Sequence, residues 1–317
     1  MVADVAGVRS TVVVVTWRGR AHIDACLDTL ARQHRPHSTL VLDNASDDGT
    51  AELVADHPSC PAVLRLDRNR GYAGGIAAAM AKVRTPFVAW LNDDAAPAPD
   101  WLARLEDALD ADPRAAAAGA MLRTPDGAVQ SAGVGLTCDG HGADLASVGP
   151  GVFGFCGGAA LLRTKALAAA GGVPADFFCY YEDTDTAWRL RLAGWRVLAV
   201  PGATAIHLHG ASTRPGSFAF HRWNERNRLL MLVRCAPAAV AVRETVRFAA
   251  ITAALPARRI TRNRSGPDAV NFTVRLRLLV LAEVAARLPA GLLARWRIGR
   301  RSTVHRSVVW RTWAGTI

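Results

Sequence analysis

The sequence lacks three features that would assign the chain to particular classes of protein. Its six cysteines show no C-x-x-C spacing, and its N-terminus does not resemble a secretory signal peptide. No uninterrupted apolar run reaches the ~20 residues of a membrane-spanning helix, since Arg243, Glu244 and Arg247 break the best candidate. We therefore expect reduced thiols, a cytoplasmic location and no crossing of the bilayer. Because the cysteine count is even, disulfides are the alternative.

The sequence also lacks the marks of disorder and of repeats. Of its 317 residues, 50% are hydrophobic and 21% are charged, and we find no internal repeat or low-complexity linker. This composition is too apolar for a disordered chain, and the length predicts one or two folded domains. A folded enzyme fits within it.

Positive charge is concentrated in the last third of the chain. Residues 214–317 hold 20 arginines against 4 acidic residues, whereas residues 1–213 hold 18 basic residues against 23 acidic ones. The composition predicts one domain over residues 1–213 and a basic C-terminal region over residues 214–317. On charge alone, that region suits an anionic membrane surface or a nucleic acid.

The first hundred residues alternate β-branched runs with helical patterns, which is typical of an α/β fold with a doubly wound, mostly parallel sheet. The expected strands are 11–16, 39–42, 62–66 and 86–91, and the expected helices are 21–33, 48–56, 72–83 and 99–111. Further helices are expected at 164–170 and from Glu182 to Gly194, with the glycine as the C-cap.

Polar residues follow each of the four expected strands. In such sheets ligands bind beyond the carboxyl ends of the strands. The residues in question are Thr16 and Trp17, the turn 43–49, the segment 67–71, and Asn92, Asp93 and Asp94. Each cluster alone is also explained by ordinary turn and helix-capping chemistry. Four clusters on one sheet edge indicate a polar site for a charged ligand.

Asp93 and Asp94 directly follow the apolar run 87–91. Adjacent carboxylates repel each other unless a cation neutralises them, and Mg²⁺ is commonly held by one or two carboxylates together with substrate phosphates. The pair therefore predicts a divalent cation that binds a diphosphate. The alternative is a loop whose acids cap the helix that opens at Pro99.

A second acidic cluster lies at the start of the helix expected from Glu182. The helix dipole stabilises acids in a first turn, so capping alone would explain Glu182, Asp183 and Asp185. The four aromatic residues between 177 and 181 would instead place a carboxylate beside a partly dry wall. Such surroundings make a carboxylate a competent general base.

Two histidines follow the apolar run 197–200. In an extended segment, His207 and His209 would point to the same face. A structural role is one interpretation. A metal ligand is the other, because two imidazoles on one face would complement a carboxylate site.

Taken in order, these motifs resemble the family-two glycosyltransferases of GT-A fold, and among them the bacterial rhamnosyltransferase-like members. The resemblance runs from about residue 12 to residue 237. It is carried by V-V-V-V-T-W, L-D-N-A-S-D-D-G-T, N-R-G-Y-A-G-G, W-L-N-D-D-A, C-G-G-A-A-L-L-R, F-F-C-Y-Y-E-D-T-D-T-A-W-R-L-R-L-A-G-W, V-P-G-A-T-A-I-H-L-H-G-A-S-T and E-R-N-R-L-L-M-L-V-R. It implies an inverting, metal-dependent transferase, with the nucleotide-sugar donor bound by residues 10–112 and the acceptor by residues 113–213.

The resemblance also implies roles for individual residues. Asp94 matches the metal-binding aspartate of the family's D-x-D-like motif, and His207 matches a later histidine that often reaches the Mg²⁺ or Mn²⁺ ion. Because the motif reads N-D-D here, Asp93 is an alternative ligand. The implied catalytic residues are the base Asp183 and its supports, Glu182 and Asp185. The implied nucleotide and sugar contacts are Thr16, Trp17, Asp43, Asn69, Gly71, Asn92, Asp93, Gly157 and Gly158.

Two further departures from the family pattern concern substrate contacts. Trp17 stands where the family more often has tyrosine or histidine, and Thr186 stands where leucine is common.

The basic C-terminal region has apolar residues at helical spacing over 236–255 and 272–288. The arginines between them are Arg243, Arg247, Arg275, Arg277 and Arg287. This pattern is typical of helices that lie in a membrane interface and contact lipid phosphates. One alternative is a set of helices packed on the first domain. Nucleic-acid binding is disfavoured, because the region is apolar and carries no recognised motif.

The resemblance and the residues together imply an enzyme of cell-envelope glycan synthesis, peripheral on the inner face of the plasma membrane. The implied reaction transfers rhamnose from dTDP-rhamnose to a lipid-linked or polysaccharide acceptor. The alternatives are a UDP-hexose or UDP-galactofuranose donor, and an inactive protein that only binds a nucleotide sugar. The expected partners are the donor, the acceptor and an anionic membrane surface, without nucleic acid.

Overall fold

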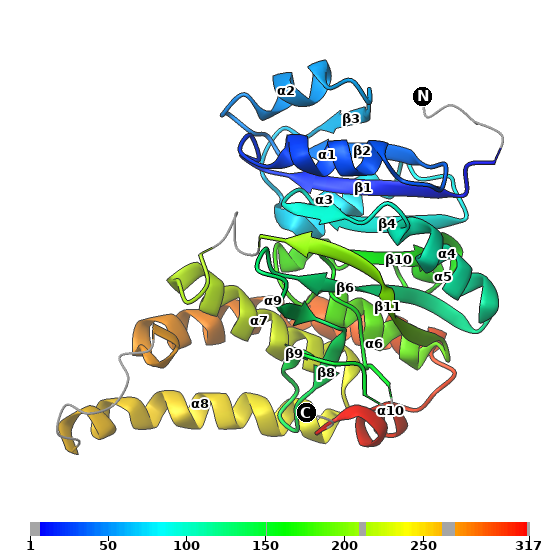
Figure 1. Cartoon of the computed structure of the whole chain (residues 1–317). Coiled ribbons are helices and arrows are strands. Elements are labelled where there is room, and N and C mark those ends of the chain that lie inside the picture. The colour runs from blue at the N-terminus through cyan, green and yellow to red at the C-terminus, as the bar shows by residue number, and fades with distance from the viewer. Residues whose placement is uncertain (1–6, 150, 209–213, 262–269, 316–317) are drawn as a thin grey trace.

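The computed structural model describes residues 7–149, 151–208, 214–261 and 270–315 (Figure 1). A nine-stranded sheet runs through the molecule in the order β3-β2-β1-β4-β10-β6-β11-β5, with β7 paired to β6. Its strands are β1 (Ser10–Thr16), β2 (Ser38–Asp43), β3 (Ala62–Arg65), β4 (Phe87–Asn92), β5 (Ala95–Pro97), β6 (Ala115–Arg123), β7 (Val129–Ser131), β10 (Ala159–Arg163) and β11 (Arg196–His207). Strands β8 (Val134–Leu136) and β9 (Gly142–Asp144) pair separately.

Helices cover the sheet and form the C-terminal part of the chain. They are α1 (Ile23–Ala31), α2 (Thr50–Asp56), α3 (Gly71–Ala79), α4 (Trp101–Ala111), α5 (Thr164–Ala169), α6 (Glu182–Leu192), α7 (Phe218–Cys235), α8 (Ala238–Thr261), α9 (Val274–Arg301) and α10 (Arg306–Trp313). The short 3₁₀ turns η1 (Ala175–Phe177) and η2 (Val270–Phe272) precede α6 and α9.

Strand β1 shows why the first half folds as a doubly wound sheet. Val12 and Val14 pack into one hydrophobic cluster with Leu27 of α1, whereas Val13 packs into another with Ile76 of α3. A strand buried on both faces needs a continuous β-branched run, and parallel sheets provide that burial by placing helices on each side. Strands β3, β2, β1 and β4 are accordingly all parallel.

The second half of the sheet is mixed. Strand β10 runs antiparallel to both β4 and β6, while β11 runs parallel to β6 and antiparallel to β5. The expected α/β class is confirmed, and the predicted strands of the first hundred residues agree with β1 to β4 within two residues. The helix expected from Glu182 ends at Leu192, and Gly194 lies one residue past the cap with φ of 86°.

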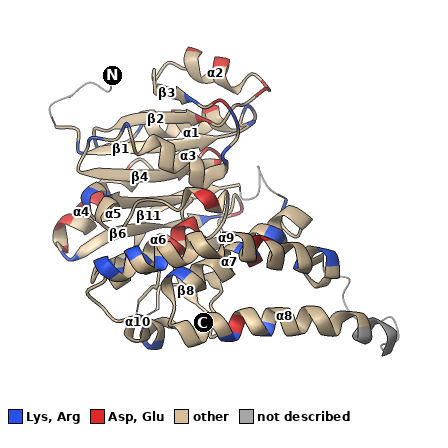
Figure 2. Cartoon of the chain, turned by 180° about the vertical axis from the view of Figure 1, so that it is seen from behind, with Lys and Arg blue, Asp and Glu red and all other residues tan. Residues whose placement is uncertain are grey.

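The C-terminal helices share a core with the rest of the chain. Leu229 and Leu232 of α7 pack in one hydrophobic cluster with Trp188 of α6 and Val280 of α9. In Figure 1, α7 and α9 lie at the level of the lower strands β6 and β11, and α8 extends below them. Figure 2 shows more basic than acidic residues along these helices. Among the described helices, none is both long enough and apolar enough to cross a bilayer. The domain boundary near Arg214 stays a prediction.

Candidate functional site

A cavity of about 380 Å³ opens beyond the carboxyl ends of β1 and β4, between the sheet and α6 and α7. This is the edge at which α/β sheets bind ligands. The predicted site residues that line it are Trp17, Asn69, Gly71, Asn92, Asp93, Asp94, Gly157, Gly158, Glu182, Asp183 and His207. The fold thus brings together residues that the sequence spreads over most of the chain.

Thr16 and Asp43 are buried behind the cavity wall, opposite each other where β1 and β2 pair. Oδ1 of Asp43 accepts a hydrogen bond from the backbone N–H of Ser46, and Oδ2 lies 3.3 Å from Nε of Arg65. Oγ1 of Thr16 and Oδ2 of Asp43 have no hydrogen-bond partner among the described residues. Buried polar atoms are nearly always paired, so the Thr16 hydroxyl is available to a ligand, whereas Oδ2 of Asp43 has the ion pair with Arg65.

The two carboxylates after β4 each lie beside a histidine. Nε2 of His207 is 3.1 Å from Oδ1 of Asp94, and Nε2 of His22 is 3.4 Å from Oδ2 of Asp93. Burial would raise the pKa of Asp94, but the hydrogen bond and charge of His207 outweigh it, so the pKa lies below its usual range. The carboxylate of Asp93 raises the pKa of His22.

Further contacts orient the imidazole of His207. Its Nδ1 lies 3.0 Å from Oε1 of Gln130, and its Nε2 lies 2.9 Å from Nδ2 of Asn92. Antiparallel pairing of β11 with β5 places His207 opposite Ala95, directly after Asp94. The predicted companion His209 falls outside the residues that the structure describes.

The oxygen chemistry of Asp93 and Asp94 fits a divalent cation. Oδ2 of Asp93 is buried beside the imidazole of His22, and hard cations such as Mg²⁺ take carboxylate oxygens. In the described residues, however, His, Cys, Asp and Glu side chains do not gather in threes with the geometry of a ready metal site. A ligand phosphate would therefore have to complete the coordination.

Glu182 and Asp183 open helix α6 and face the cavity. Burial raises the pKa of both carboxyls, and the charge of Asp183 adds to the effect on Glu182, whose pKa rises to about 8. Oδ2 of Asp183 accepts from the N–H of Gly157 at 2.9 Å, and Oδ1 accepts from Thr184. These donors favour the carboxylate form of Asp183, while Glu182 keeps its proton at neutral pH.

Asp185 does not line the cavity, although the sequence grouped it with the catalytic acids. Its fully buried carboxylate is paired with Nε of Arg189 at 2.6 Å and with Nε of Arg234 at 2.9 Å. Two residues along a helix correspond to a turn of about 200°, so Asp183 and Asp185 point to opposite sides. Asp185 instead ties α6 to α7.

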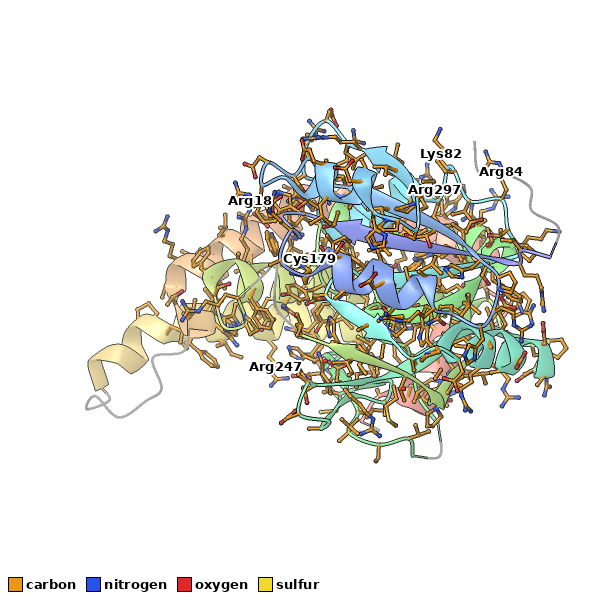
Figure 3. The ribbon with its side chains drawn as sticks, turned by 45° about the horizontal axis from the view of Figure 1, so that its top comes forward. Arg18, Lys82, Arg84, Cys179, Arg247 and Arg297 are labelled. Carbon is orange, nitrogen blue, oxygen red and sulfur yellow. The ribbon has the colours of Figure 1, made fainter. Side chains whose placement is uncertain are left out.

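An aromatic wall closes the cavity on the side of α7. It consists of Phe178, Tyr180, Tyr181 and Trp223, and the rings of Phe178 and Trp223 lie 4.7 Å apart. Phe177 lies in the core instead. Figure 3 labels Cys179 of the same loop, which also lines the cavity, and Arg18, which is paired with Asp47.

His22 and Trp223 have no motif that would single them out in the sequence. A lone histidine before a helix and a tryptophan in an arginine-rich segment are both ordinary. Their places in the site come from tertiary packing, through the pairing of β1 with β4 and of α7 with α6.

Comparisons with known proteins agree with these features. The family model "Glycosyl transferase family 2" matches residues 11–171. An N-acetylglucosaminyl-diphospho-decaprenol L-rhamnosyltransferase of Mycobacterium tuberculosis is 29% identical over 235 residues, which cover 64% of this chain and 76% of the relative.

Among the similar solved structures, two cover 90% or more of this chain. A mannosyltransferase from Pyrobaculum calidifontis, in complex with GDP-Man and Mn²⁺, is 22% identical with a TM-score of 0.53, over 98% of this chain and 81% of that one. GalNAc-T7 with UDP, GalNAc and Mn²⁺ is 12% identical with a TM-score of 0.61, over 90% and 58% of the two chains. At these identities the likeness shows the fold, and it confirms the expected GT-A class.

Proposed function

The chain belongs to glycosyl transferase family 2, and from this premise we propose that it transfers a sugar from a nucleotide diphosphate to a lipid-linked acceptor. One observation carries the proposal. Asp93 and Asp94, whose oxygens could bind a cation that carries a diphosphate, line the same cavity as Asp183, a partly buried carboxylate that could act as a general base. The mycobacterial relative, whose name specifies a decaprenol-linked acceptor, supports the choice of acceptor.

The proposed donor is dTDP-rhamnose, because the same relative is an L-rhamnosyltransferase. The nucleotide would lie against Thr16, Trp17 and Asp43, where the buried Thr16 hydroxyl has no hydrogen-bond partner among the described residues. The sugar would lie toward the remaining predicted contacts, Asn69, Gly71, Asn92, Gly157 and Gly158. A UDP-hexose or UDP-galactofuranose is the alternative donor.

A divalent cation, Mg²⁺ or Mn²⁺, would be held by Asp94 with Asp93 and His207, and when bound it would neutralise the leaving diphosphate. Asp183 accepts the proton of the acceptor hydroxyl. The hydroxyl oxygen forms its bond to the anomeric carbon as the carbon–oxygen bond to the diphosphate breaks on the opposite face, which inverts the centre. The Gly157 N–H and Thr184 fix the direction in which Asp183 presents its oxygens.

Glu182 has a supporting role in this mechanism. Its carboxyl is buried next to Asp183, and Oε2 has no hydrogen-bond partner in the described structure. Because Glu182 remains protonated at neutral pH, the negative charge of the pair resides on Asp183. The neutral Glu182 can donate a hydrogen bond to the acceptor.

We also propose that helix α9 meets an anionic membrane on the cytoplasmic side, where a lipid-linked acceptor would be found. An exposed apolar stripe runs along it, the α9 stripe, made of Leu278, Leu288, Leu292, Leu293 and Trp296. Exposed arginines flank the stripe, at Arg275, Arg297 and Arg300. The one acid of α9, Glu283, is paired with Arg222 and Arg226. Apolar residues bordered by arginines suit the interface of an anionic bilayer.

The structure modifies the expected contribution of the arginines between the apolar residues. Arg277 is buried, donates to Oγ1 of Thr252 and to the carbonyl of Phe248, and therefore cannot reach lipid. Arg247 is half exposed but is paired with Asp139 and Glu244. The surface for lipid is therefore the outer face of α9.

The proposed function is tested with purified protein, Mn²⁺ and a polyprenyl-diphosphate-linked N-acetylglucosamine. dTDP-rhamnose, UDP-glucose, UDP-galactose and UDP-galactofuranose are offered in separate reactions. The proposal expects a longer glycolipid with dTDP-rhamnose. The new glycosidic bond should have the anomeric configuration opposite to that of the sugar in the donor. Product formed only with a UDP sugar would replace the donor. If the protein transfers no sugar and no nucleoside diphosphate stabilises it, the function is excluded.

A further inference from the structure

The loop between η1 and α6 has an unusual backbone. Phe178, Tyr180 and Tyr181 have φ angles of 68°, 70° and 69°. Residues with bulky side chains rarely adopt this left-handed region, and such conformations persist only when the surrounding structure holds them. Three of them within four residues therefore require a specific restraint.

Asn227 of α7 supplies that restraint. Its Nδ2 lies 2.9, 2.8 and 2.8 Å from the carbonyl oxygens of Phe177, Cys179 and Tyr180, so its two hydrogens serve three acceptors and one of them is shared. Nε of Arg226 donates to Oδ1 of Asn227 at 2.9 Å, so the amide must direct its NH₂ group at the loop. Arg226 also donates from Nη2 to the Phe177 carbonyl at 2.6 Å.

The restraining side chains are themselves fixed. Asn227 is completely buried and Arg226 is 3% exposed. The guanidinium of Arg226 lies 3.4 Å from Oε2 of Glu283 on α9, which balances its charge inside the protein. A chain of contacts thus runs from α9 through α7 to the loop.

The restrained loop touches both sides of the proposed reaction. On the donor side, the Phe178 carbonyl accepts from the N–H of Ala73 at 3.0 Å, and a Cβ on Gly71 would lie 2.1 Å from the same oxygen. On the catalytic side, Tyr181 is the N-cap of α6, directly before Glu182 and Asp183. A change in the loop would therefore displace the base relative to the donor.

We propose that Asn227, oriented by Arg226, is a positioning residue for the proposed transfer, on which this inference rests. By holding the three carbonyls, it fixes the direction in which α6 presents Asp183 and the aromatic wall. The hydrogen-bonding of the NH₂ group carries this role, and the volume of the side chain does not. Asn227 has no contact with the substrates.

The test compares Asn227→Asp, which keeps the shape but replaces the NH₂ donors with an acceptor, with Asn227→Ala. Both variants should lower kcat by about tenfold or more while the donor KM stays within about twofold, since Thr16, Trp17 and Asp43, which would hold the nucleotide, do not contact this loop. Amide hydrogen exchange over residues 177–185 should accelerate in both. A residue that only fills space would tolerate the isosteric aspartate.

Arg295→Ala is the matched control. Nη1 of Arg295 donates to the carbonyls of Val233 and Ala236 at 2.8 and 2.7 Å, which is the same kind of restraint at the C-terminal end of α7. Its loss should lower Tm without changing kcat or the exchange of residues 177–185. If Arg295→Ala reduces kcat as much as Asn227→Asp does, general destabilisation explains both and the proposal fails.

Two results distinguish a failure of this inference from a failure of the proposed function. Hydrogen exchange needs no turnover, so parent-like exchange over 177–185 in Asn227→Asp overturns the inference even if the enzyme is active. Conversely, if the parent protein has no transferase activity, the proposed function is refuted. The hydrogen-exchange result then still shows whether Asn227 restrains the loop. If the Asn227 variants do not fold, Arg226→Gln replaces them. It should also accelerate exchange over residues 177–185, and parent-like exchange in it would overturn the inference.

Discussion

Nε2 of His207 lies 3.1 Å from Oδ1 of Asp94, across the antiparallel pairing of β11 with β5. Both side chains are buried, and the imidazole is also held by Gln130 and Asn92. The fold itself therefore holds these two side chains together. Because β4 is a central strand of the core, the carboxylates that follow it are held rigidly at the rim of the cavity.

Asp94→Ala should weaken nucleoside diphosphate binding in the presence of Mn²⁺ and remove metal-dependent turnover. The reason is that the proposed cation links this carboxylate to the leaving group. Calorimetric titration of dTDP with Mn²⁺ and with EDTA measures the effect. An unchanged Mn²⁺ requirement and unchanged turnover would show that the cation binds elsewhere.

His207→Ala should raise the Mn²⁺ concentration needed for half-maximal activity without unfolding the protein. The imidazole is one of three proposed ligands, so its loss should weaken the site rather than abolish it. His57→Ala is the control, because His57 is a buried histidine beside Asp24 and Asp28, outside the cavity. If both variants keep the parent metal dependence, His207 has a structural role.

Glu182 should make the folded state less stable as pH rises. Its pKa is raised from 4.5 to about 8 in the folded protein, so the folded state binds a proton that the unfolded state has lost. Between these values the free energy of unfolding falls with pH, by at most about 1.4 kcal/mol per unit from this group. Urea denaturation at pH 5 and pH 8 should show a shallower fall in Glu182→Gln. Equal falls in parent and variant would contradict the raised pKa.

The paired substitution Leu292→Ser and Trp296→Ser should reduce binding to anionic vesicles. It removes apolar contacts from the α9 stripe, whose flanking arginines should each add about 1 kcal/mol near the surface. Co-sedimentation with vesicles at low and high salt measures the effect. Val63→Ser on β3, an exposed apolar residue away from α9, is the control. Equal binding by parent and paired variant would remove α9 from the interface.

Much of the fold is predictable because its signals are local. The β-branched run of β1 requires burial on both faces, and the acids that follow β4 stand where a parallel sheet exposes its strand ends. The opposite directions of Asp183 and Asp185 also follow from helix geometry, so any support that Asp185 gives to Asp183 acts through the position of α6.

The remaining parts of the site depend on contacts that no local pattern encodes. Strand β10 is inserted antiparallel between β4 and β6, and this pairing brings Gly158 beside Asn92. Asn227 stands in the motif E-R-N-R that the family resemblance includes, and Trp223 stands in no such motif, but the contacts of both come from the packing of α7, which is largely buried. Their roles become visible only when α7 packs against the loop before α6.

The most direct test of the central claim is Asp183→Asn, measured for donor binding and for transfer in parallel. The amide keeps the shape of the carboxylate but cannot accept the proton of the acceptor hydroxyl. Transfer should fall about a hundredfold to ten-thousandfold or more, while the affinity for dTDP-rhamnose with Mn²⁺ should hardly change. Asp185→Asn, which alters a carboxylate outside the cavity, should chiefly lower stability. A near-parent rate in Asp183→Asn, or a collapse of transfer only in Asp185→Asn, would contradict the assignment of Asp183 as the base.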